Sequence, residues 1–466
     1  MGGGSSSLFT SYYLLKDILE INRCLGLYST QEYNETNYNY LKKLVIKNGC
    51  ITIKFSQWYI SNLRTKKHKN IKTFCKYFED IFDQCPYHNE YETQLAFETN
   101  FGIKLYDMIR RESLIRIASG SIGQVYKAIL KDTNEVVAIK VKHPNVDYDM
   151  DKYKYLLSII NWLKQFKYFK DKYYLQFDLN EFMEDVYTQA NFNIEAQNAK
   201  KFNKIYENNK MVYIPKVINH TKDIIISEYV EATNFEDLSN YHKFKTAINF
   251  YCFLTDSAVI KNFVHTDLHC RNWKARQMDD NNYQLVIYDC ALVYFVEDIN
   301  SIRLIWKIFE YDDQEDNLIY LLKNYLIKEG TLDDKLETLI RTMYRKFNET
   351  KLDFSYFSND LLNTLKENHF IMDKSMASIF LIYSLALEFL TEINITNSNA
   401  ESIKDRYLVI RNNMFDLLTF CETTNSYNDL QEYLRVKIKD TNKEEKSLDN
   451  LFSDLQRNEL TFPAIC

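Results

Sequence analysis

The segment FVHTDLHCRNW, residues 263–273, gathers acidic, amide and imidazole side chains within a few positions. Asp267 is followed five residues later by Asn272, a spacing typical of loops that catalyse phosphoryl transfer. In such loops the aspartate orients the attacking hydroxyl or accepts its proton, while the asparagine holds a magnesium ion. The alternative is a zinc site formed by His265 and His269, but no further ligand follows at a familiar spacing. The spacing therefore favours magnesium over zinc.

A second acid, Asp289, ends the apolar run LVIYD twenty-two residues after Asp267. It can supply another oxygen ligand to the same ion, because Mg²⁺ prefers oxygen and completes its shell with phosphates and water. Asn272 and Asp289 are the predicted metal ligands, and Asp267 is the predicted acid-base residue. His265 stands where such loops carry their histidine.

Two upstream stretches predict contacts with phosphates. The loop ASGSIGQV, residues 118–125, matches G-x-G-x-x-G-x-V with alanine replacing the first glycine, and glycine lets backbone N–H groups approach an anion closely. Lys140 in VAIK supplies a fixed cation on the next predicted strand, and Glu195 is the best-placed carboxylate to hold it. Taken alone, the loop could be a plain hairpin turn and Lys140 could be a surface lysine. The prediction therefore depends on the presence of four motifs in this order: the loop, VAIK, the segment with Asp267, and Asp289.

Hydrophobic spacing predicts the elements that must position these residues. Apolar residues recur at helical spacing from residue 8 to about 112. Segments rich in β-branched residues predict strands at 113–130, 135–143, 211–219 and 223–230, and a later strand at 283–293. The predicted fold class is α+β. Its parts are an N-terminal helical extension (1–112), a small sheet-rich lobe with inserted helices (113–230) and a helical large lobe (231–466).

Composition narrows the function classes. The net charge of −6 gives no basic excess, which argues against nucleic acid as a partner. The nine cysteines form no CxxC pair and no secretory signal precedes them, so free thiols in a reducing compartment are expected. The apolar stretch Met376–Leu390 contains Glu388 and is shorter than the roughly 20 residues of a membrane span. It predicts a buried core helix.

The N-terminus MGGGSSSLF fits the N-myristoylation pattern, with Gly2 as acceptor and Ser6 at the serine/threonine position. A glycine- and serine-rich leader is the alternative. One acyl chain binds membranes only marginally, and the basic run at 64–72 is either a second membrane attraction or a solvated loop. These features predict a cytoplasmic protein that contacts membranes peripherally where Gly2 is acylated.

Together the motifs resemble the UbiB-type atypical kinases, the aarF-domain family associated with ubiquinone biosynthesis. The resemblance runs from about residue 47 to 293. ASGSIGQV, VAIKVKHPNV, FNIEAQN and HTDLHCRN are similar to the family's A-x-A-S-I-G-Q-V, V-A-V-K-V-Q-H-P-G-V, F-x-x-E-A-x-N and H-A-D-P-H-P-G-N. Upstream, KFSQ at 54–57 looks like the family's K-x-G-Q. The HP and EAxN features are not general to kinases, which makes the resemblance specific.

The resemblance implies a protein-kinase-like two-lobe fold that binds ATP or ADP with magnesium beneath the helical extension. It implies an ion pair between Lys140 and Glu195, catalysis at Asp267, and metal binding by Asn272 and Asp289. The other residues that it implies for nucleotide binding are Ala118, Ser119, Gly120, Ser121, Ile122, Gly123, Val125, Ala138, Glu228 and Val230, with Ser227 as gatekeeper and Lys54 and Gln57 reaching in from the extension.

The chain also departs from the family pattern. Gln189 and Asn191 replace both acids of the family's E-x-D, and Ser56 replaces the glycine of K-x-G-Q. Ala291 ends DCA where the family has D-F-G, and Gly120 stands where alanine is expected. Because two carboxylates that would anchor the extension are amides, we hypothesise that the extension is held less tightly than in the family.

The leading interpretation is an ATP-dependent kinase or ATPase whose substrate is lipid-like, quinone-related or another small molecule. Retention of Asp267, Asn272 and Asp289 favours turnover, because a pure scaffold has no physical need for all three. A nucleotide-binding pseudokinase scaffold is the alternative. A small-molecule phosphotransferase of the aminoglycoside or choline kinase type shares H-x-D-x-x-x-x-N, but it would not explain KFSQ, HPNV or EAQN.

Overall fold

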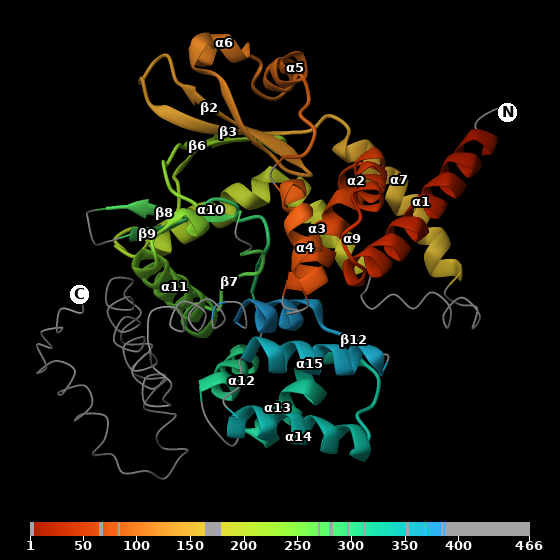
Figure 1. Ribbon diagram of the computed structural model, residues 1–466. Helices are drawn as coiled ribbons and strands as arrows, with labels where there is room; N and C mark the ends of the chain where they lie inside the picture. Colours follow the sequence, from red (N-terminus) through yellow and green to blue (C-terminus); the bar gives the residue numbers. More distant parts are fainter. Residues whose placement is uncertain are drawn as a thin grey trace, which may run out of the picture.

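The computed structural model of the protein describes residues 4–64, 69–82, 84–163, 179–268, 271–278, 283–295, 298–310, 314–350, 354–368, 370–383 and 386. A sheet-rich lobe lies above a helical lobe in Figure 1, with the helices α1 to α4 beside them. Helices and strands are mixed throughout, which confirms the predicted α+β class.

The small lobe is built on a five-stranded antiparallel sheet in the order β1-β2-β3-β6-β5. It forms where β-branched residues are dense, as the sequence predicted. β2 pairs with β3 without interruption, from Gly123 opposite Lys142 to Ile129 opposite Val136. The strands are β1 (Ile115–Ser119), β2 (Gly123–Ile129), β3 (Val136–Lys142), β5 (Val217–His220) and β6 (Ile224–Glu228).

Two helices, α5 (Glu90–Phe101) and α6 (Leu105–Met108), cover one face of this sheet (Figure 1). α5 begins at a capping box in which Asn89 and Glu92 exchange hydrogen bonds of 2.9 Å, and it ends at Gly102, whose φ of 69° is left-handed. Both helices, which the sequence analysis assigned to the extension, bury side chains against the sheet. The division at residue 112 stays a prediction. The shared core includes Phe97, Leu105, Ile109, Tyr126, Val137 and Ile139.

The extension is a helical bundle with its own apolar core. Its second helix begins at Asn34, whose side chain accepts a hydrogen bond from the Asn37 backbone N–H. Burial of the core contributes more to such helices than their intrinsic propensity. The elements are α1 (Gly4–Thr30), α2 (Glu35–Lys47), α3 (Cys50–Arg64), α4 (Lys69–Tyr77), η1 (Glu79–Phe82) and, beyond α6, η2 (Arg111–Ser113). The core includes Ile21, Cys24, Leu25, Leu41, Phe74 and Phe78.

Helices inserted after β3 join the extension to the small lobe. They are α7 (Val146–Leu163), α9 (Leu179–Ala190) and α10 (Phe192–Ile205). One apolar cluster unites them with α1 and α3. Its members include Leu14, Ile51, Ile122, Met150, Phe182, Val186 and Phe192.

The contact between α3 and α7 depends on a glycine. Asp149 Oδ2 accepts the Cys50 backbone N–H at 3.2 Å, and the Tyr153 hydroxyl donates to the Asn48 carbonyl oxygen at 3.1 Å. Gly49 lies between them with a φ of 84°, and a Cβ there would collide with the Asp149 carboxylate. This position therefore requires glycine both for its backbone conformation and for the close approach of the two helices.

The large lobe contains a three-stranded sheet in the order β4-β9-β8, in which β4 is parallel to β9. β8 was not predicted. Its buried Trp273 and Ala275 alternate with charged residues, but two buried positions are too few to be recognised as a strand. The strands are β4 (Val212–Tyr213), β8 (Trp273–Gln277) and β9 (Tyr283–Ile287), with the pairs β7 (Val264–His265) and β10 (Val293–Tyr294), and β11 (Ile327–Glu329) and β12 (Ile371–Met372).

Most of the remaining described part of the large lobe is helical, as predicted, and residues 387–466 of the predicted lobe lie outside the described residues. Residues 374–383 are helical and contain buried side chains, in agreement with the start of the core helix expected at Met376–Leu390. Residues 384, 385 and 387–390 of that helix lie outside the described ones. No helix in the described ranges has the length and apolar character needed to cross a bilayer. The elements are η3 (Phe235–Asp237), α11 (Asn240–Thr255), the π-helical η4 (Asp256–Ile260), α12 (Ile299–Glu310), α13 (Glu315–Leu321), the π-helical η5 (Leu322–Leu326), α14 (Asp334–Thr350) and α15 (Phe354–Glu367).

Some predictions fall on residues outside the described ranges. These are acylation of Gly2, the centre of the basic run at 65–68, and His269 of the zinc alternative. Each stays a prediction.

Candidate nucleotide and metal site

A cavity of about 320 Å³ lies between the two lobes, within the size range of small-molecule sites. Ser119 does not line it, because this buried side chain donates its hydroxyl to the Pro86 carbonyl oxygen at 3.3 Å. The other residues predicted to contact nucleotide or metal do line it. They are Lys54, Gln57, Ala118, Gly120, Ser121, Ile122, Gly123, Val125, Ala138, Lys140, Glu195, Glu228, Val230, Asp267, Asn272 and Asp289.

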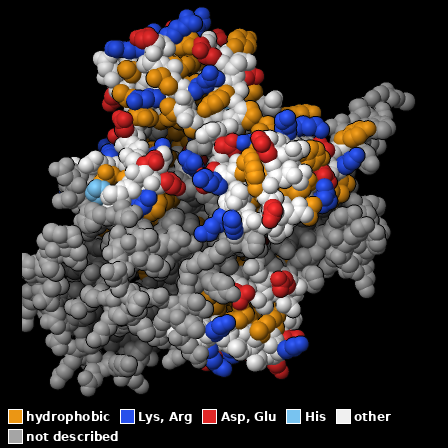
Figure 2. All heavy atoms as spheres, viewed as in Figure 1, with side chains coloured by type: hydrophobic (Ala, Val, Ile, Leu, Met, Phe, Trp, Pro, Cys, Tyr) orange, Lys and Arg blue, Asp and Glu red, His pale blue; other side chains and the backbone are white. Residues whose placement is uncertain are grey.

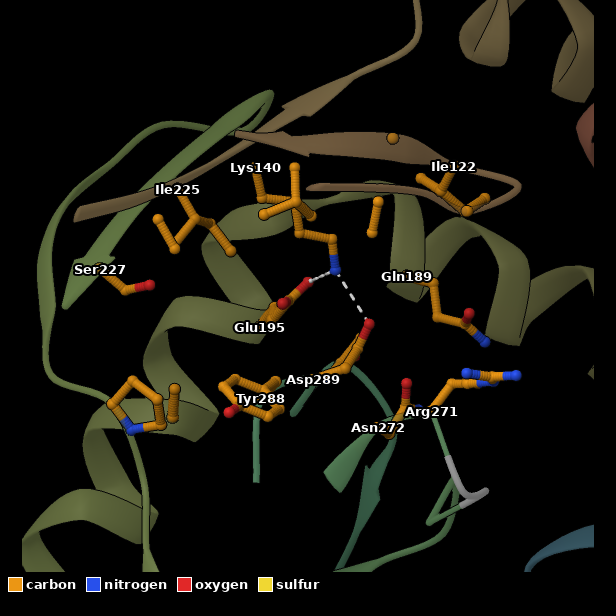
Figure 3. Close-up of a pocket in the computed structure, with 18 of the residues that line it drawn as sticks. Ile122, Lys140, Gln189, Glu195, Ile225, Ser227, Arg271, Asn272, Tyr288 and Asp289 are labelled. Carbon is orange, nitrogen blue, oxygen red and sulfur yellow. Dashed lines mark hydrogen bonds and ion pairs between the residues drawn. The ribbon is translucent and has the colours of Figure 1, made fainter. Parts of the chain in front are cut away.

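Lys140 connects the two lobes through its ammonium group. Its Nζ lies 2.7 Å from Glu195 Oε2 on α10 and 2.9 Å from Asp289 Oδ2 just beyond β9, as the dashed lines in Figure 3 mark. The Glu195 side chain is 5% exposed and that of Asp289 is 32% exposed, so Asp289 is the more accessible acid. Lys140 also lies 5.0 Å from the centroid of the Phe192 ring. The lysine is thereby fixed at the centre of the cavity.

The pKa values of these three groups are strongly coupled. Burial alone would raise the pKa of Asp289, but Lys140 and the Ala291 N–H, 3.0 Å from Oδ1, hold it well below its usual range. Burial and repulsion from Asp289 raise the pKa of Glu195 to about 7, although Lys140 opposes them. Burial would lower the pKa of Lys140, yet attraction to both carboxylates raises it. At neutral pH the cavity therefore contains an ionised aspartate beside a charged lysine.

His265 links the two predicted acids. Its Nε2–H donates to the Asp289 carbonyl oxygen, while its Nδ1 accepts the Asp267 backbone N–H at 3.2 Å. Both bonds require the same neutral tautomer, and burial lowers the pKa of the imidazole. Asn272 Nδ2 donates to the Asp267 carbonyl oxygen at 2.7 Å, which leaves the amide Oδ1 as its metal-binding atom. One hydrogen-bonded unit thus holds Asp267, Asn272 and Asp289.

Hydrogen bonds within its own backbone and to His143 hold the loop at 118–123 in place. The Gly120 N–H donates to the Gly123 carbonyl oxygen at 2.9 Å and closes the turn, and His143 Nε2 lies 3.2 Å from the Gly120 carbonyl oxygen. A Cβ on Gly123 would lie 2.6 Å from the Val141 carbonyl oxygen. Gly123 is therefore needed for the packing of β2 on β3, a reason that the sequence analysis did not foresee.

His143 continues into a buried polar chain. Its Nδ1 lies 2.7 Å from the Nδ1 of His88, whose Nε2 lies 2.9 Å from Thr93 Oγ1. Burial lowers the pKa of both imidazoles, and that of His88 falls to about 4. Two neutral rings satisfy every contact if His88 donates to His143 and His143 donates to the loop carbonyl. In this arrangement, protonation of His143 would place its Nδ1–H against the Nδ1–H of His88, whereas protonation of His88 would add an N–H that faces Thr93 Oγ1.

The segment after β6 forms the back of the cavity. Glu228 donates its N–H to the Lys216 carbonyl oxygen at 2.9 Å, so the sheet already uses this donor. Tyr288, immediately before Asp289, donates its hydroxyl to the Val230 carbonyl oxygen at 3.1 Å, and its ring lies on the floor of the cavity (Figure 3). Ser227, the predicted gatekeeper, also lines the cavity and contributes only a short side chain.

The extension reaches the cavity through α3. Lys54 Nζ lies 3.4 Å from Asp267 Oδ2, so the extension contacts the predicted acid-base residue directly. Gln57 donates from Nε2 to the Ile81 carbonyl oxygen at 2.6 Å, and its Oε1 accepts the Ser121 hydroxyl at 3.5 Å. The extension therefore touches both the loop and the large-lobe side of the cavity.

The two amides that replace the family's acids occupy different places. Asn191 caps α10, because its side chain accepts the Asn193 N–H at 3.2 Å, and it thereby supports the helix of Glu195. Gln189 is buried and lines the cavity. The weaker hold on the extension that we expect from these replacements stays a prediction.

Sequence reasoning missed Arg271, Lys274 and Tyr288, which also line the cavity. Arg271 had a signal, because it stands where H-A-D-P-H-P-G-N has glycine. Lys274 lies on β8 and Tyr288 directly follows β9. The pairing of these strands decides which side chains face the cavity, and hydrophobic spacing alone does not reveal it.

The donor set of the cavity fits a magnesium ion. In the described part of the chain, no group of three or more His, Cys, Asp and Glu residues is placed to hold a metal alone. Asn272 and Asp289 offer oxygen atoms on the same side of the cavity (Figure 3), and an ion that takes its remaining ligands from phosphates and water needs few protein groups.

Residues 80–317 match the family model described as the ABC1 atypical kinase-like domain. The chain belongs to this family. The match confirms the resemblance to UbiB-type atypical kinases, and the fold is the kinase-like α+β fold of that family. Membership of the family shows that the chain is kinase-like, and it does not specify the reaction or the substrate.

Curated relatives share about a quarter of their residues with the aligned part of this chain. A probable serine/threonine-protein kinase of Dictyostelium discoideum is 26% identical over 246 residues, which cover 51% of this chain and 35% of that protein. An ABC1 family protein of Schizosaccharomyces pombe is 26% identical over 272 residues, with coverages of 55% and 48%. A chloroplastic aarF domain-containing protein kinase of Arabidopsis thaliana is 27% identical over 192 residues, with coverages of 39% and 27%. The chain thus spans less than half the length of each.

Among solved structures, a Mycobacterium tuberculosis protein in complex with erythromycin is similar with a TM-score of 0.43 and 19% identity, covering 56% of this chain and 68% of that one. The Rio2 kinase of Chaetomium thermophilum, solved as an ADP/Mg²⁺-phosphoaspartate complex, has a TM-score of 0.29 and 12% identity, with coverages of 62% and 96%.

Proposed function

We propose that the cavity binds ATP or ADP with magnesium and that the chain transfers the terminal phosphoryl group to a hydroxyl or to water. The observation that carries the proposal is the position of Lys140, whose Nζ lies within 2.9 Å of both Glu195 and Asp289. This arrangement presents one fixed cation beside an ionised metal-binding acid, as phosphoryl transfer requires.

The residues of the cavity have separate roles in the proposed reaction. Asp289 Oδ1 and Asn272 Oδ1 would hold magnesium, which when bound supplies positive charge to the phosphate oxygens. Lys140 would bind the α- and β-phosphates, and the backbone of residues 120–123 would cover them. Val230 and its neighbours would contact the base, above the ring of Tyr288.

Asp267 would accept the proton of the attacking hydroxyl. The hydroxyl oxygen forms a bond to the γ-phosphorus, and the bond from that phosphorus to the β,γ-bridging oxygen breaks. The electron pair of the broken bond stays on the β-phosphate of ADP, which leaves. Asp267 later returns the proton to solvent, so that atoms and charge balance.

The substrate class is part of the proposal. A lipid-like, quinone-related or other small molecule remains the proposed acceptor, and nucleic acid is disfavoured by the net charge of −6. We also propose a cytoplasmic location, with peripheral membrane contact where Gly2 is myristoylated. Mass spectrometry of the intact protein from a eukaryotic host tests the acylation.

A nucleotide-binding pseudokinase scaffold is the second candidate, and one contact favours it. Lys54 Nζ lies 3.4 Å from Asp267 Oδ2, so the carboxylate that must accept a proton is already paired with the extension. Lys54→Met separates the two candidates. It raises ATP hydrolysis if the pair restrains an enzyme, whereas it leaves hydrolysis undetectable if the chain is a scaffold.

The principal test measures magnesium-dependent ATP binding and hydrolysis, with and without liposomes that contain a quinone-like amphiphile. The parent protein should bind and hydrolyse ATP. Asp289→Asn should abolish hydrolysis, because the metal loses its charged ligand. Asp316→Asn is the matched control, since Asp316 is 94% exposed and lies in the large lobe away from the cavity. Equal hydrolysis by the parent and Asp289→Asn proteins would refute the proposed enzyme.

A further inference from the structure

His143 contacts the loop at 120–123 twice, although the roles assigned above do not include it. Its backbone N–H donates to the Ile122 carbonyl oxygen at 2.9 Å, and its Nε2 lies 3.2 Å from the Gly120 carbonyl oxygen. Gly120, Ser121 and Ile122 line the cavity, whereas His143 does not. One residue outside the cavity therefore fixes the directions of two carbonyl groups in the loop proposed to cover the phosphates.

The direction of the Gly120 carbonyl group decides what the loop offers to an anion. A trans peptide unit is planar, so the N–H of Ser121 points away from the oxygen of Gly120. Because that oxygen is directed at His143, this N–H is directed toward the cavity. Among the described residues, the protein provides no hydrogen-bond acceptor for it. Ile122 of the same loop lies across the cavity from Asn272 (Figure 3), so the N–H faces the space proposed for the phosphates.

Reversal of this peptide unit would weaken phosphate binding. It would replace the N–H by the carbonyl oxygen of Gly120, whose partial negative charge repels a phosphate. Glycine at position 120 makes the reversal easier than the alanine of the family pattern would, because glycine has no Cβ. The hydrogen bond to His143 therefore has more to restrain in this chain.

A chain of polar groups behind the loop determines which nitrogen of His143 carries the proton. Gln124 Oε1 accepts the His88 N–H at 3.0 Å, so the amide nitrogen of Gln124 faces the Tyr126 hydroxyl as a donor. That hydroxyl lies 2.7 Å from Thr93 Oγ1, which in turn lies 2.9 Å from His88 Nε2. The Nδ1 atoms of His88 and His143 lie 2.7 Å apart.

The two ends of this chain set the direction of its hydrogen bonds. The amide nitrogen of Gln124 can only donate, and the Gly120 carbonyl oxygen can only accept. Between neutral rings, each hydroxyl and imidazole then accepts from one neighbour and donates to the next, so His143 carries its proton on Nε2. Burial lowers the pKa of both imidazoles, which keeps the rings neutral at pH 7. Every donor in the chain thus points toward the loop, and each bond polarises the next.

We propose that His143 is a positioning residue for the triphosphate, because it holds the peptide unit between Gly120 and Ser121 with its N–H toward the phosphates. His88 and Thr93 support it by fixing the tautomer of its ring. The inference rests on the proposed nucleotide function. It makes α5, which carries Thr93 and lies outside the cavity, part of the structure that sets nucleotide affinity.

The first test compares two amide variants of the full chain. His143→Asn keeps a polar group near the position of Nδ1 and loses the donor at Nε2, whereas His143→Gln keeps a donor near Nε2. Displacement of a fluorescent ATP analogue measures the affinities of a non-hydrolysable ATP analogue with Mg²⁺ and of adenosine. His143→Asn should weaken the ATP analogue about threefold to tenfold, the range for one lost hydrogen bond, and change adenosine affinity less than about twofold. His143→Gln should bind both nearly as the parent does. His242→Asn, on α11 and outside the cavity lining, is the control and should leave both affinities unchanged.

The second test changes the chain without touching the loop. Thr93→Val removes the hydroxyl that donates to His88 Nε2, so the proton of His88 can move to that nitrogen and leave His143 without its donor. The affinity of the ATP analogue should fall about twofold to fivefold, and Thr93→Ser should restore it. In a His143→Asn background, Thr93→Val should have little further effect, because the chain acts through His143.

NMR of protein labelled at the histidine nitrogens gives a direct readout of the tautomers. The proton should be found on Nε2 of His143 and on Nδ1 of His88. The opposite tautomers would overturn the assignment while leaving the proposed function intact. Equal weakening of the ATP analogue and adenosine in His143→Asn, or no weakening, would do the same. A parent protein that binds no nucleotide would overturn both proposals.

Discussion

Replacement of Lys140 by methionine should destabilise the protein in a pH-dependent manner. The substitution removes the ammonium that lies 2.7 Å from Glu195 and 2.9 Å from Asp289, and it leaves two carboxylates together in a largely buried site. Removal of one partner of a buried ion pair costs about 3–5 kcal/mol. The hydrophobic side chain of methionine keeps most of the packing volume, so the cost is chiefly electrostatic.

Protonation of Glu195 sets the pH dependence. The pKa of this acid in the folded protein is already raised to about 7, and loss of the lysine raises it further. Below pH 7 Glu195 is protonated in both folded proteins, so the difference in unfolding free energy is constant. Above pH 7 only the variant keeps the proton in its folded state. Its stability therefore falls relative to the parent by up to about 1.4 kcal/mol per pH unit.

The assay is urea unfolding followed by tryptophan fluorescence at pH 6, 7, 8 and 9. Lys43→Met, on an exposed position of α2, is the control and should change the unfolding free energy by less than about 0.5 kcal/mol. In a Glu195→Gln background the pH-dependent part of the Lys140→Met effect should disappear. A Lys140→Met effect that stays constant from pH 6 to 9 would refute the electrostatic reasoning.

Three further predictions concern stability and the loop. Gly123→Ala should lower the unfolding free energy by about 1–3 kcal/mol, because its Cβ would meet the Val141 carbonyl oxygen at 2.6 Å; thermal unfolding measures the loss, and an unchanged midpoint contradicts it. Ser56→Ala should stabilise the protein by about 1 kcal/mol, since the buried Ser56 hydroxyl lacks a hydrogen-bond partner among the described residues; a lower unfolding midpoint would count against this. Because the pKa of His88 falls to about 4, its protonation should lower stability by up to about 3 kcal/mol as pH decreases from about 6.5 toward 4. His88→Gln should therefore make the pH dependence of acid unfolding shallower, with His143, whose pKa is also lowered, accounting for part of what remains; an unchanged slope would contradict the assignment to His88.

The sequence predicted the chemistry of the site better than its geometry. Asp267, Asn272 and Asp289 could be found because each lies in a motif of fixed spacing. The spacing could not reveal that Lys140 contacts an acid 149 positions away, since this contact depends on how the two lobes meet. Nor could it reveal that Lys54 pairs with Asp267.

The fold was predicted where periodic patterns are long and missed where they are short. The β1–β2 hairpin, β3 and the later helices have enough residues to show their periodicity. β8 has five residues and its polar side chains hide its buried face. The packing of α5 and α6 on the sheet could not be predicted for another reason. Helical spacing indicates an apolar face, but it leaves open whether a helix or a sheet covers that face.

Ser227 has a practical consequence for chemical tools. Ala138 lies opposite Ser227 on the neighbouring strand and also lines the cavity, so two short side chains stand beside the segment proposed to contact the base. A purine that carries a large substituent on its exocyclic amine should then enter without any engineering of the protein. Such an analogue with a transferable thiophosphate would label acceptor molecules selectively in a crude extract, and so identify them.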